Sequence, residues 1–353
     1  MKLSRILLLL GAGLTLIGGC ATKPAAKTEY TFFPPAPDQP RIQYLTSFGQ
    51  EADLGGVGKF KTFVVGQDKQ IKPIYKPYGI SAGKGKLYIA DTEAANVSEI
   101  DLANRQMRAL RPTGKGALEL PINVVVDADG TRYVSDAKKL QVLVYNKDNK
   151  FQGAIGKGSE IKPCGLALRG DTLYVTDITN HCVRVYDKTT RQERFTIPRD
   201  AGNLKSKLFL PTNISLDEGG RIYVTDTGAW RVQIYDADGN FLRSVGEMGL
   251  EPGRFSMPKG LGVDRQNRLF VVDAATQVVQ LFDDHGQLLM FFGYPETSGP
   301  GALYLPAGLA IDYDNVAFFQ KYAAPGYQIE FLIYVANQAG ANKVSVFGFL
   351  KKA

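Results

Sequence analysis

Short runs in which apolar and polar residues alternate cover most of this chain, and residues 210–246 show the pattern clearly. Ile222 and Val224 alternate there with Tyr223 and Thr225, which is the two-residue period of a β-strand. Turns rich in glycine and aspartate separate this strand from its neighbours NISLD, VQIYD and FLRSVG. We therefore expect a sheet of four short strands.

The same unit occurs six times, and a proline marks each copy. These prolines are 42 to 48 residues apart, at positions 77, 121, 163, 211, 258 and 306. Such a period is typical of stacked supersecondary units, and four-stranded units arranged radially form a β-propeller. The predicted fold class is all-β, a six-bladed β-propeller of four-stranded blades.

The run RIQYLTSFG, residues 41–49, is a strand pattern far from any neighbour. The sixth unit ends in KVSVFGFLKKA and lacks a fourth strand, and YLTSFG matches FLRSVG in residue type at each position. We predict that this N-terminal strand completes the last blade, so that residues 41–353 form one propeller domain and two exposed strand edges are removed.

Residues 1–19 have the composition of an export signal. Lys2 and Arg5 precede an apolar run from Ile6 to Ile17, which is shorter than the ~20 residues that a membrane-spanning helix needs. The ending LIGGC looks like a bacterial lipobox, in which the thiol of Cys20 takes a diacylglycerol. An ordinary signal peptide is the alternative.

Residues 20–40 follow as a predicted tether between the lipidated Cys20 and the propeller. Five prolines in this segment favour an extended chain, which reaches roughly 60 to 70 Å. The 42 basic and 35 acidic residues form no block of like charge. Nucleic acid is therefore not an expected partner.

The third unit contains NHCVRVYD, Asn180 to Asp187, and the fourth contains WRVQIYD, residues 230–236. Together with the preceding Pro-x-Gly and Tyr-Val-x-Asp stretches, these residues make the unit resemble the NHL repeat. The resemblance implies a six-bladed propeller that binds protein or RNA. Related propellers include lyases and lactonases that hold a metal ion in the central channel. With its lipobox, the chain is similar to bacterial NHL-repeat lipoproteins.

An aspartate ends the second strand of five units. These residues form either a ring of carboxylates around a channel or acceptors for turn N–H groups; the second interpretation is favoured, because a residue present in every blade is most simply part of the blade. They are Asp91, Asp136, Asp177, Asp226 and Asp273, and Asn337 takes the place in unit six.

Metal chemistry has few candidate ligands. A catalytic zinc site usually takes three protein ligands, whereas the two histidines, His181 and His285, occupy different kinds of position. Calcium needs only oxygen ligands, so Asn123, Asn213 and nearby carboxylates leave a channel Ca²⁺ open. No cofactor is predicted.

Cys164 and Cys182 both lie in unit three, and export to an oxidising compartment favours a disulfide. A second strand is expected between them, however, which separates the two backbones by more than a disulfide spans. A disulfide and two free thiols both stay open.

The sixth unit contains an insert, because Pro306 and Asn337 are 31 residues apart where the other units have 14 or 15. The insert reads as two alternating runs about an Ala-Pro-Gly turn, and a protruding hairpin is predicted. Its aromatic residues suit partner recognition or packing beneath the propeller; they are Phe318, Phe319, Tyr322, Tyr327 and Phe331.

These patterns lead to two hypotheses about function. The first is a monomeric, lipid-anchored binding or scaffold protein of the bacterial envelope, which contacts a protein or envelope component. Ala21 after the cysteine resembles the sorting signal for the outer membrane. The second is a metal-dependent hydrolase or lyase that works in the channel. The two differ in that the enzyme needs converging ligands and the scaffold needs exposed apolar surface.

Overall fold

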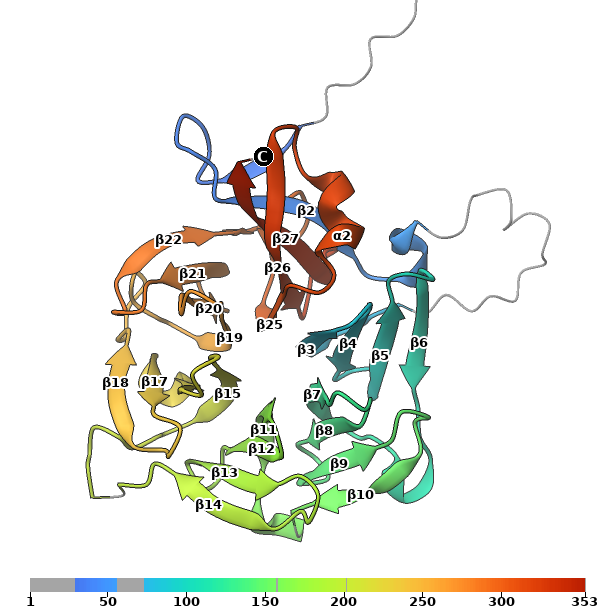
Figure 1. Cartoon of the computed structure of the whole chain (residues 1–353), viewed down its shortest axis with the longest axis vertical. Coiled ribbons are helices and arrows are strands. Elements are labelled where there is room, and N and C mark those ends of the chain that lie inside the picture. Colours follow the sequence, from blue (N-terminus) through green and yellow to red (C-terminus); the bar gives the residue numbers. More distant parts are fainter. Residues whose placement is uncertain (1–28, 56–72, 157, 201, 353) are drawn as a thin grey trace, which may run out of the picture.

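Six β-sheets surround a central channel in the computed structural model of the protein (Figure 1). The structure describes residues 29–55, 73–156, 158–200 and 202–352. This fold is a six-bladed β-propeller of antiparallel sheets, as the sequence predicts. No helix within these described ranges is long and apolar enough to cross a membrane.

The first strand of each blade faces the channel and the following strands lie progressively outward (Figure 1). The strands of blades 1 to 3 are β3 (Pro77–Gly83), β4 (Lys86–Asp91), β5 (Asn96–Asp101) and β6 (Gln106–Leu110); β7 (Pro121–Val126), β8 (Arg132–Asp136), β9 (Gln141–Tyr145) and β10 (Phe151–Ile155); β11 (Pro163–Arg169), β12 (Thr172–Asp177), β13 (Cys182–Asp187) and β14 (Glu193–Ile197).

Blades 4 and 5 follow the same order, whereas blade 6 is larger. Their strands are β15 (Pro211–Leu216), β16 (Ile222–Asp226), β17 (Arg231–Tyr235) and β18 (Phe241–Val245); β19 (Pro258–Val263), β20 (Leu269–Asp273), β21 (Val278–Phe282) and β22 (Leu288–Phe292); β25 (Pro306–Asp312), β26 (Tyr327–Asn337) and β27 (Val344–Lys352). A short parallel pair, β23 (Tyr294–Pro295) and β24 (Ala302–Leu303), precedes blade 6. Single 3₁₀ turns are η1 (Glu51–Leu54), η2 (Gly114–Gly116), η3 (Gly158–Glu160) and η4 (Thr227–Ala229).

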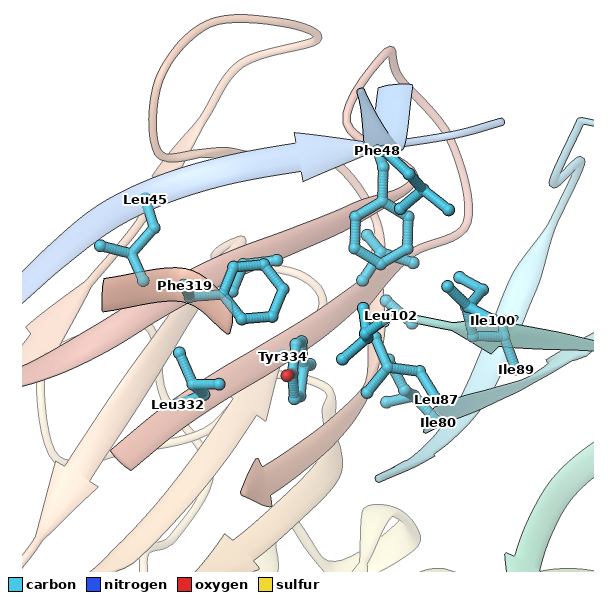
Figure 2. Packing of buried hydrophobic residues seen from close by; sticks show 14 of the residues in the cluster. Leu45, Phe48, Ile80, Leu87, Ile89, Ile100, Leu102, Phe319, Leu332 and Tyr334 are labelled. Atoms are coloured by element: carbon cyan, nitrogen blue, oxygen red, sulfur yellow. The ribbon is translucent and has the colours of Figure 1, made fainter. Parts of the chain in front are cut away.

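Burial differs between the inner and outer strands of a blade. Every residue of β16 is buried, whereas exposed and partly buried residues alternate along the outer strand β18. The reason is that neighbouring blades pack against both faces of an inner strand. Each hydrophobic cluster joins two adjacent blades; one of them joins blade 6 to blade 1 and contains Phe48, Leu87 and Tyr334 (Figure 2).

Blade 6 takes two strands from the N-terminal part of the chain. β2 (Ile42–Phe48) pairs antiparallel with β27, and β1 (Thr31–Phe33) pairs with β2. The sheet order is therefore β25-β26-β27-β2-β1, with five strands.

The presence of β1 differs from the extended tether predicted for residues 20–40. Phe32 packs against Tyr327 and Phe33 against Phe347, with ring centroids 5.8 and 6.2 Å apart. Packing of these two partly buried rings holds residues 31–33, which stay extended, on the sheet as a strand and not as a free tether. Residues 20–28 of the predicted tether lie outside the described residues, as does the predicted signal segment 1–19.

The insert in blade 6 is not the hairpin that the sequence predicts. Its first half is a short helix, α2 (Val316–Phe319), followed by a 3₁₀ turn, η5 (Gln320–Tyr322). Only its second half is a strand, which lengthens β26 to 11 residues. The prediction overlooked that Val316 and Phe319 are three residues apart, a spacing that puts both side chains on one face of a helix.

Candidate functional site

The central channel of the propeller contains a cavity. Its volume is about 370 Å³, and inner-strand residues from all six blades line it, including Ser81, Val125, Leu168, Ser215 and Ile311. Most of the lining side chains are apolar, but polar atoms make up most of the surface that faces the cavity. A cavity of this size falls within the range that holds small ligands.

Two asparagines supply the channel's amide groups. Asn123 Nδ2 lies 3.5 Å from Asn213 Oδ1, and the two residues come from blades 2 and 4. Their Oδ1 atoms accept the N–H of Val124 and Ile214 at 2.7 and 2.9 Å. The channel calcium that the sequence leaves open would use these oxygens as ligands, and a backbone hydrogen bond already occupies one of the two lone pairs of each.

No group of three or more His, Cys, Asp or Glu side chains in the described part of the chain could hold a metal ion. His181 has a positive φ of 54° in the turn before β13, and its Nδ1 contacts the carbonyl of Phe209. The main-chain N–H of His285 donates to Asp283 in a separate turn. The two histidines therefore do not form one site.

The five repeated aspartates each end the second strand of a blade, directly before a turn, and do not line the channel cavity. All five are fully buried. Asp91 accepts N–H groups from Tyr75, Lys76, Glu93 and Ala94, at 2.6 to 3.1 Å. Main-chain N–H groups of the preceding loop also donate to the other four, Asp136, Asp177, Asp226 and Asp273.

Cys164 and Cys182 are free thiols. β12 lies between the strands that carry them, because Asp177 pairs with Pro163 on one side and with Cys182 on the other. The disulfide left open by the sequence is therefore not formed. Burial raises the pKa of Cys164 to about 12 and that of Cys182 to about 11. Cys20 lies outside the described residues.

The aromatic residues of the insert pack on the propeller itself. Phe319 and Phe331 are buried, and Phe331 stacks on Phe349 with ring centroids 4.8 Å apart. The other three, Phe318, Tyr322 and Tyr327, are partly buried against the same cluster as Phe319, which Figure 2 shows beside Leu45 and Tyr334. The insert therefore presents no exposed aromatic surface of the kind that the partner-binding interpretation requires.

Exposed apolar side chains gather instead on one face of the ring. We call it the proline face, because the prolines that begin the inner strands lie there. The loops between blades and the turns between second and third strands also lie on this face. Nine exposed large apolar residues belong to those segments: Tyr75, Leu204, Phe209, Leu210, Trp230, Met248, Leu250, Met257 and Leu305.

Hydrogen bonds bring part of this apolar set together around blades 4 and 5. Thr227, in the turn that ends with Trp230, donates its N–H to Leu210 and its hydroxyl to the carbonyl of Pro258, at 3.0 and 2.6 Å. Met257 precedes that proline. These contacts bring together the segments that carry Leu210, Trp230 and Met257.

A lysine reaches the channel mouth on the same face. The Nζ of Lys259 lies 5.1 Å from the ring centroid of Tyr78, and burial lowers its pKa. Lys259 is not among the residues that the six units share, so the repeat pattern does not single it out. Aligning the residue after each proline would have revealed it as the one charged side chain among Tyr78, Ile122, Cys164, Thr212, Lys259 and Ala307.

Comparisons with known proteins support the fold. A protein-family model described as a 6-bladed beta-propeller matches residues 205–290. A structural genomics protein of unknown function from Bacteroides thetaiotaomicron is similar at 17% identity and a TM-score of 0.58, over 88% of this chain and 76% of that one.

Two enzymes share the architecture. A gluconolactonase from Xanthomonas campestris has 14% identity and a TM-score of 0.55, over 88% of this chain and 90% of its own. Virginiamycin B lyase from Staphylococcus aureus has 15% identity and a TM-score of 0.52, over 78% and 82%. At such identities the likeness shows the fold alone.

Proposed function

We propose that this protein is a binding or scaffold module of the bacterial envelope, anchored by a lipid on Cys20, whose proline face contacts a protein partner. The observation that carries the proposal is the concentration of exposed apolar side chains on that face. Large apolar patches on soluble surfaces are typical of interaction sites. A rigid ring also presents its loops without reorganisation, which lowers the entropy cost of binding.

Photo-crosslinking in intact cells tests the partner surface. A photoreactive amino acid replaces Leu250, which is 72% exposed on the proline face, or Lys84, which is exposed in the turn between β3 and β4 at the opposite end of the channel. We expect one defined adduct from position 250 and none from position 84. The additional change Phe209→Ser should abolish the adduct while the melting temperature stays unchanged. Equal adducts from both positions would contradict the proposal.

The lipid anchor is tested separately. Mass spectrometry of the N-terminal peptide should find a diacylglyceryl group on Cys20, and Cys20→Ala should release the protein from the membrane fraction. An unmodified cysteine on a protein that stays with the membrane would overturn this part of the proposal.

A metal-dependent channel enzyme is the second candidate, and the size of the channel cavity favours it. One tightly bound calcium ion per chain, with a lower melting temperature after chelation, would support that reading. We expect the melting temperature of the purified protein to be unchanged by a chelator, because the described residues offer no group of three or more His, Cys, Asp or Glu side chains that could hold a metal ion.

A further inference from the structure

The mouth of the channel on the proline face is ringed by the residues that follow the six prolines. Five of them are uncharged, and Lys259 on β19 is the exception. The structure therefore places one positive charge, that of Lys259, where the six inner strands begin, close to the axis of the ring.

Blade 6 carries a small residue at this ring of positions. Ala307 occupies the equivalent position in blade 6, which lies between the blades of Lys259 and Tyr78, and it is fully buried. The backbones also approach closely, since a Cβ on Gly308 would lie 2.2 Å from the carbonyl oxygen of Tyr78. The ammonium group thus reaches the Tyr78 ring, which favours a cation.

Two further lysines surround Lys259. Lys76 in blade 1 and Lys162 in blade 3 directly precede their prolines. Charge on Lys76 adds to the effect of burial in lowering the pKa of Lys259. The positive charges of Lys259 and Lys162 both act to lower the pKa of the buried Cys164 thiol, against the larger effect of burial. These three lysines belong to blades 1, 3 and 5, which alternate with the other three blades around the ring. Positive charge therefore lies on several sides of the channel mouth.

No carboxylate in the described part of the chain forms an ion pair with any of these three lysines. The nearby Asp91 and Asp177 accept main-chain N–H groups at the roots of the turns. Lys259 is partly buried, and even partial removal of an uncompensated cation from water costs free energy. An anion bound at the mouth would recover that cost, because charge-assisted hydrogen bonds are stronger than neutral ones.

We propose that the channel mouth on the proline face binds a compact oxyanion, a carboxylate or phosphate group, at Lys259, with Lys76 and Lys162 adding to the attraction. The site goes beyond the proposed scaffold function and does not depend on it, since a free small anion is sufficient to occupy it. Tyr78 forms one wall, and its ring fixes the position of the ammonium group.

Reaction of the purified full chain with pyridoxal 5′-phosphate, a phosphate-bearing aldehyde, tests the site. An amine with a lowered pKa attacks the aldehyde to give an imine and water, and borohydride reduction then makes the label permanent. Peptide mapping should find Lys259 labelled first. Millimolar citrate or inorganic phosphate should protect it, whereas chloride at the same ionic strength should not. Protection by citrate alone identifies a carboxylate ligand, and protection by phosphate alone a phosphate ligand.

Two variants provide the matched comparison. Lys259→Met should weaken citrate or phosphate binding about tenfold in calorimetry, the usual effect of losing one charged hydrogen bond. Lys84→Met, which removes an exposed lysine near the opposite end of the channel, should leave binding unchanged. Slow labelling of Lys259 in the wild-type chain, or labelling that neither anion prevents, would overturn the proposal even if Lys259→Met failed to fold. If the photo-crosslinking experiment gave no partner adduct while citrate or phosphate still bound, only the proposed scaffold function would be contradicted.

Discussion

The carboxylate of Asp177 connects three segments of blade 3. It accepts the N–H of Lys162 at 3.1 Å, the side-chain amide of Asn180 at 2.7 Å and the guanidinium of Arg184 at 2.8 Å. Burial alone would raise the pKa of Asp177, but the hydrogen bond from Arg184 and those from the turn outweigh it and lower that pKa. The ionised carboxylate therefore contributes to folding.

We predict that Asp177→Asn lowers the free energy of unfolding at pH 7 by about 1–3 kcal/mol, since it weakens a buried charged hydrogen bond. Because the folded pKa is lowered, the contribution of Asp177 is complete above its ordinary pKa of about 4 and is lost as the pH falls through the lowered value. The wild type and the variant should therefore converge in acid.

Urea unfolding at a series of pH values measures this difference. Asp273→Asn is the matched control, because Asp273 accepts main-chain N–H groups and forms no ion pair with an arginine in the described structure. A gap between the wild type and Asp177→Asn that stays constant from pH 7 into acid would contradict the role given to Arg184.

At the scale of elements, α2 acts as a cover over the junction between blades 6 and 1. Phe319 is 2% exposed, and it packs against Tyr322 and Tyr334 with ring centroids 6.2 and 6.0 Å apart. Figure 2 shows its ring beside Leu45 of β2 and Leu332 of β26. The insert thus joins the N-terminal strand to the rest of the blade.

Phe319→Ala is predicted to lower the free energy of unfolding by about 3–5 kcal/mol, because it leaves a cavity in a packed cluster. Phe318→Ala, which changes the partly buried neighbouring residue, should lower the free energy of unfolding by clearly less. Chemical denaturation of both variants checks the difference. Equal stabilities would show that α2 is not part of the core.

The sequence predicted the repeated elements well and the irregular ones poorly, for a physical reason. The second strands are recognisable because Ile222, Val224 and their equivalents meet the same neighbours in every blade. β1 and α2 have no counterpart among the repeats, and their conformation depends on the sheet that they cover. Likewise, the position of Lys259 over Tyr78 joins side chains of two different blades, 5 and 1. A conformation that depends on residues far away in the sequence cannot be predicted from the local pattern of apolar and polar residues.

At the scale of the whole molecule, the ring brings the two ends of the described chain into one sheet. Ile42 pairs with Phe349 and Phe48 with Val344. Gln43 also donates to the carbonyl of Tyr322 and accepts the N–H of Ala324, at 2.8 and 2.9 Å. β2 therefore holds both the last strand and the insert.

Deletion of residues 41–49 is predicted to cause association, because the edge of β27 becomes available to another chain. Size-exclusion chromatography with light scattering should detect oligomers or aggregates. Deletion of residues 29–33 alone should leave a monomer, since β2 still covers β27. A monomeric 41–49 deletion with an unchanged melting temperature would contradict the role given to β2.

The pairing of β2 with β27 also has a consequence for the time course of folding. The ribosome makes β2 among the first segments of the propeller and β27 last, so β2 must wait for nearly the whole chain before it can pair with β27. Joining segments so distant in sequence gives the fold a high contact order, which slows the final step. Until then both blade edges are open to other chains. The slowest folding phase should therefore be the formation of blade 6, and a holding chaperone would have its main effect there.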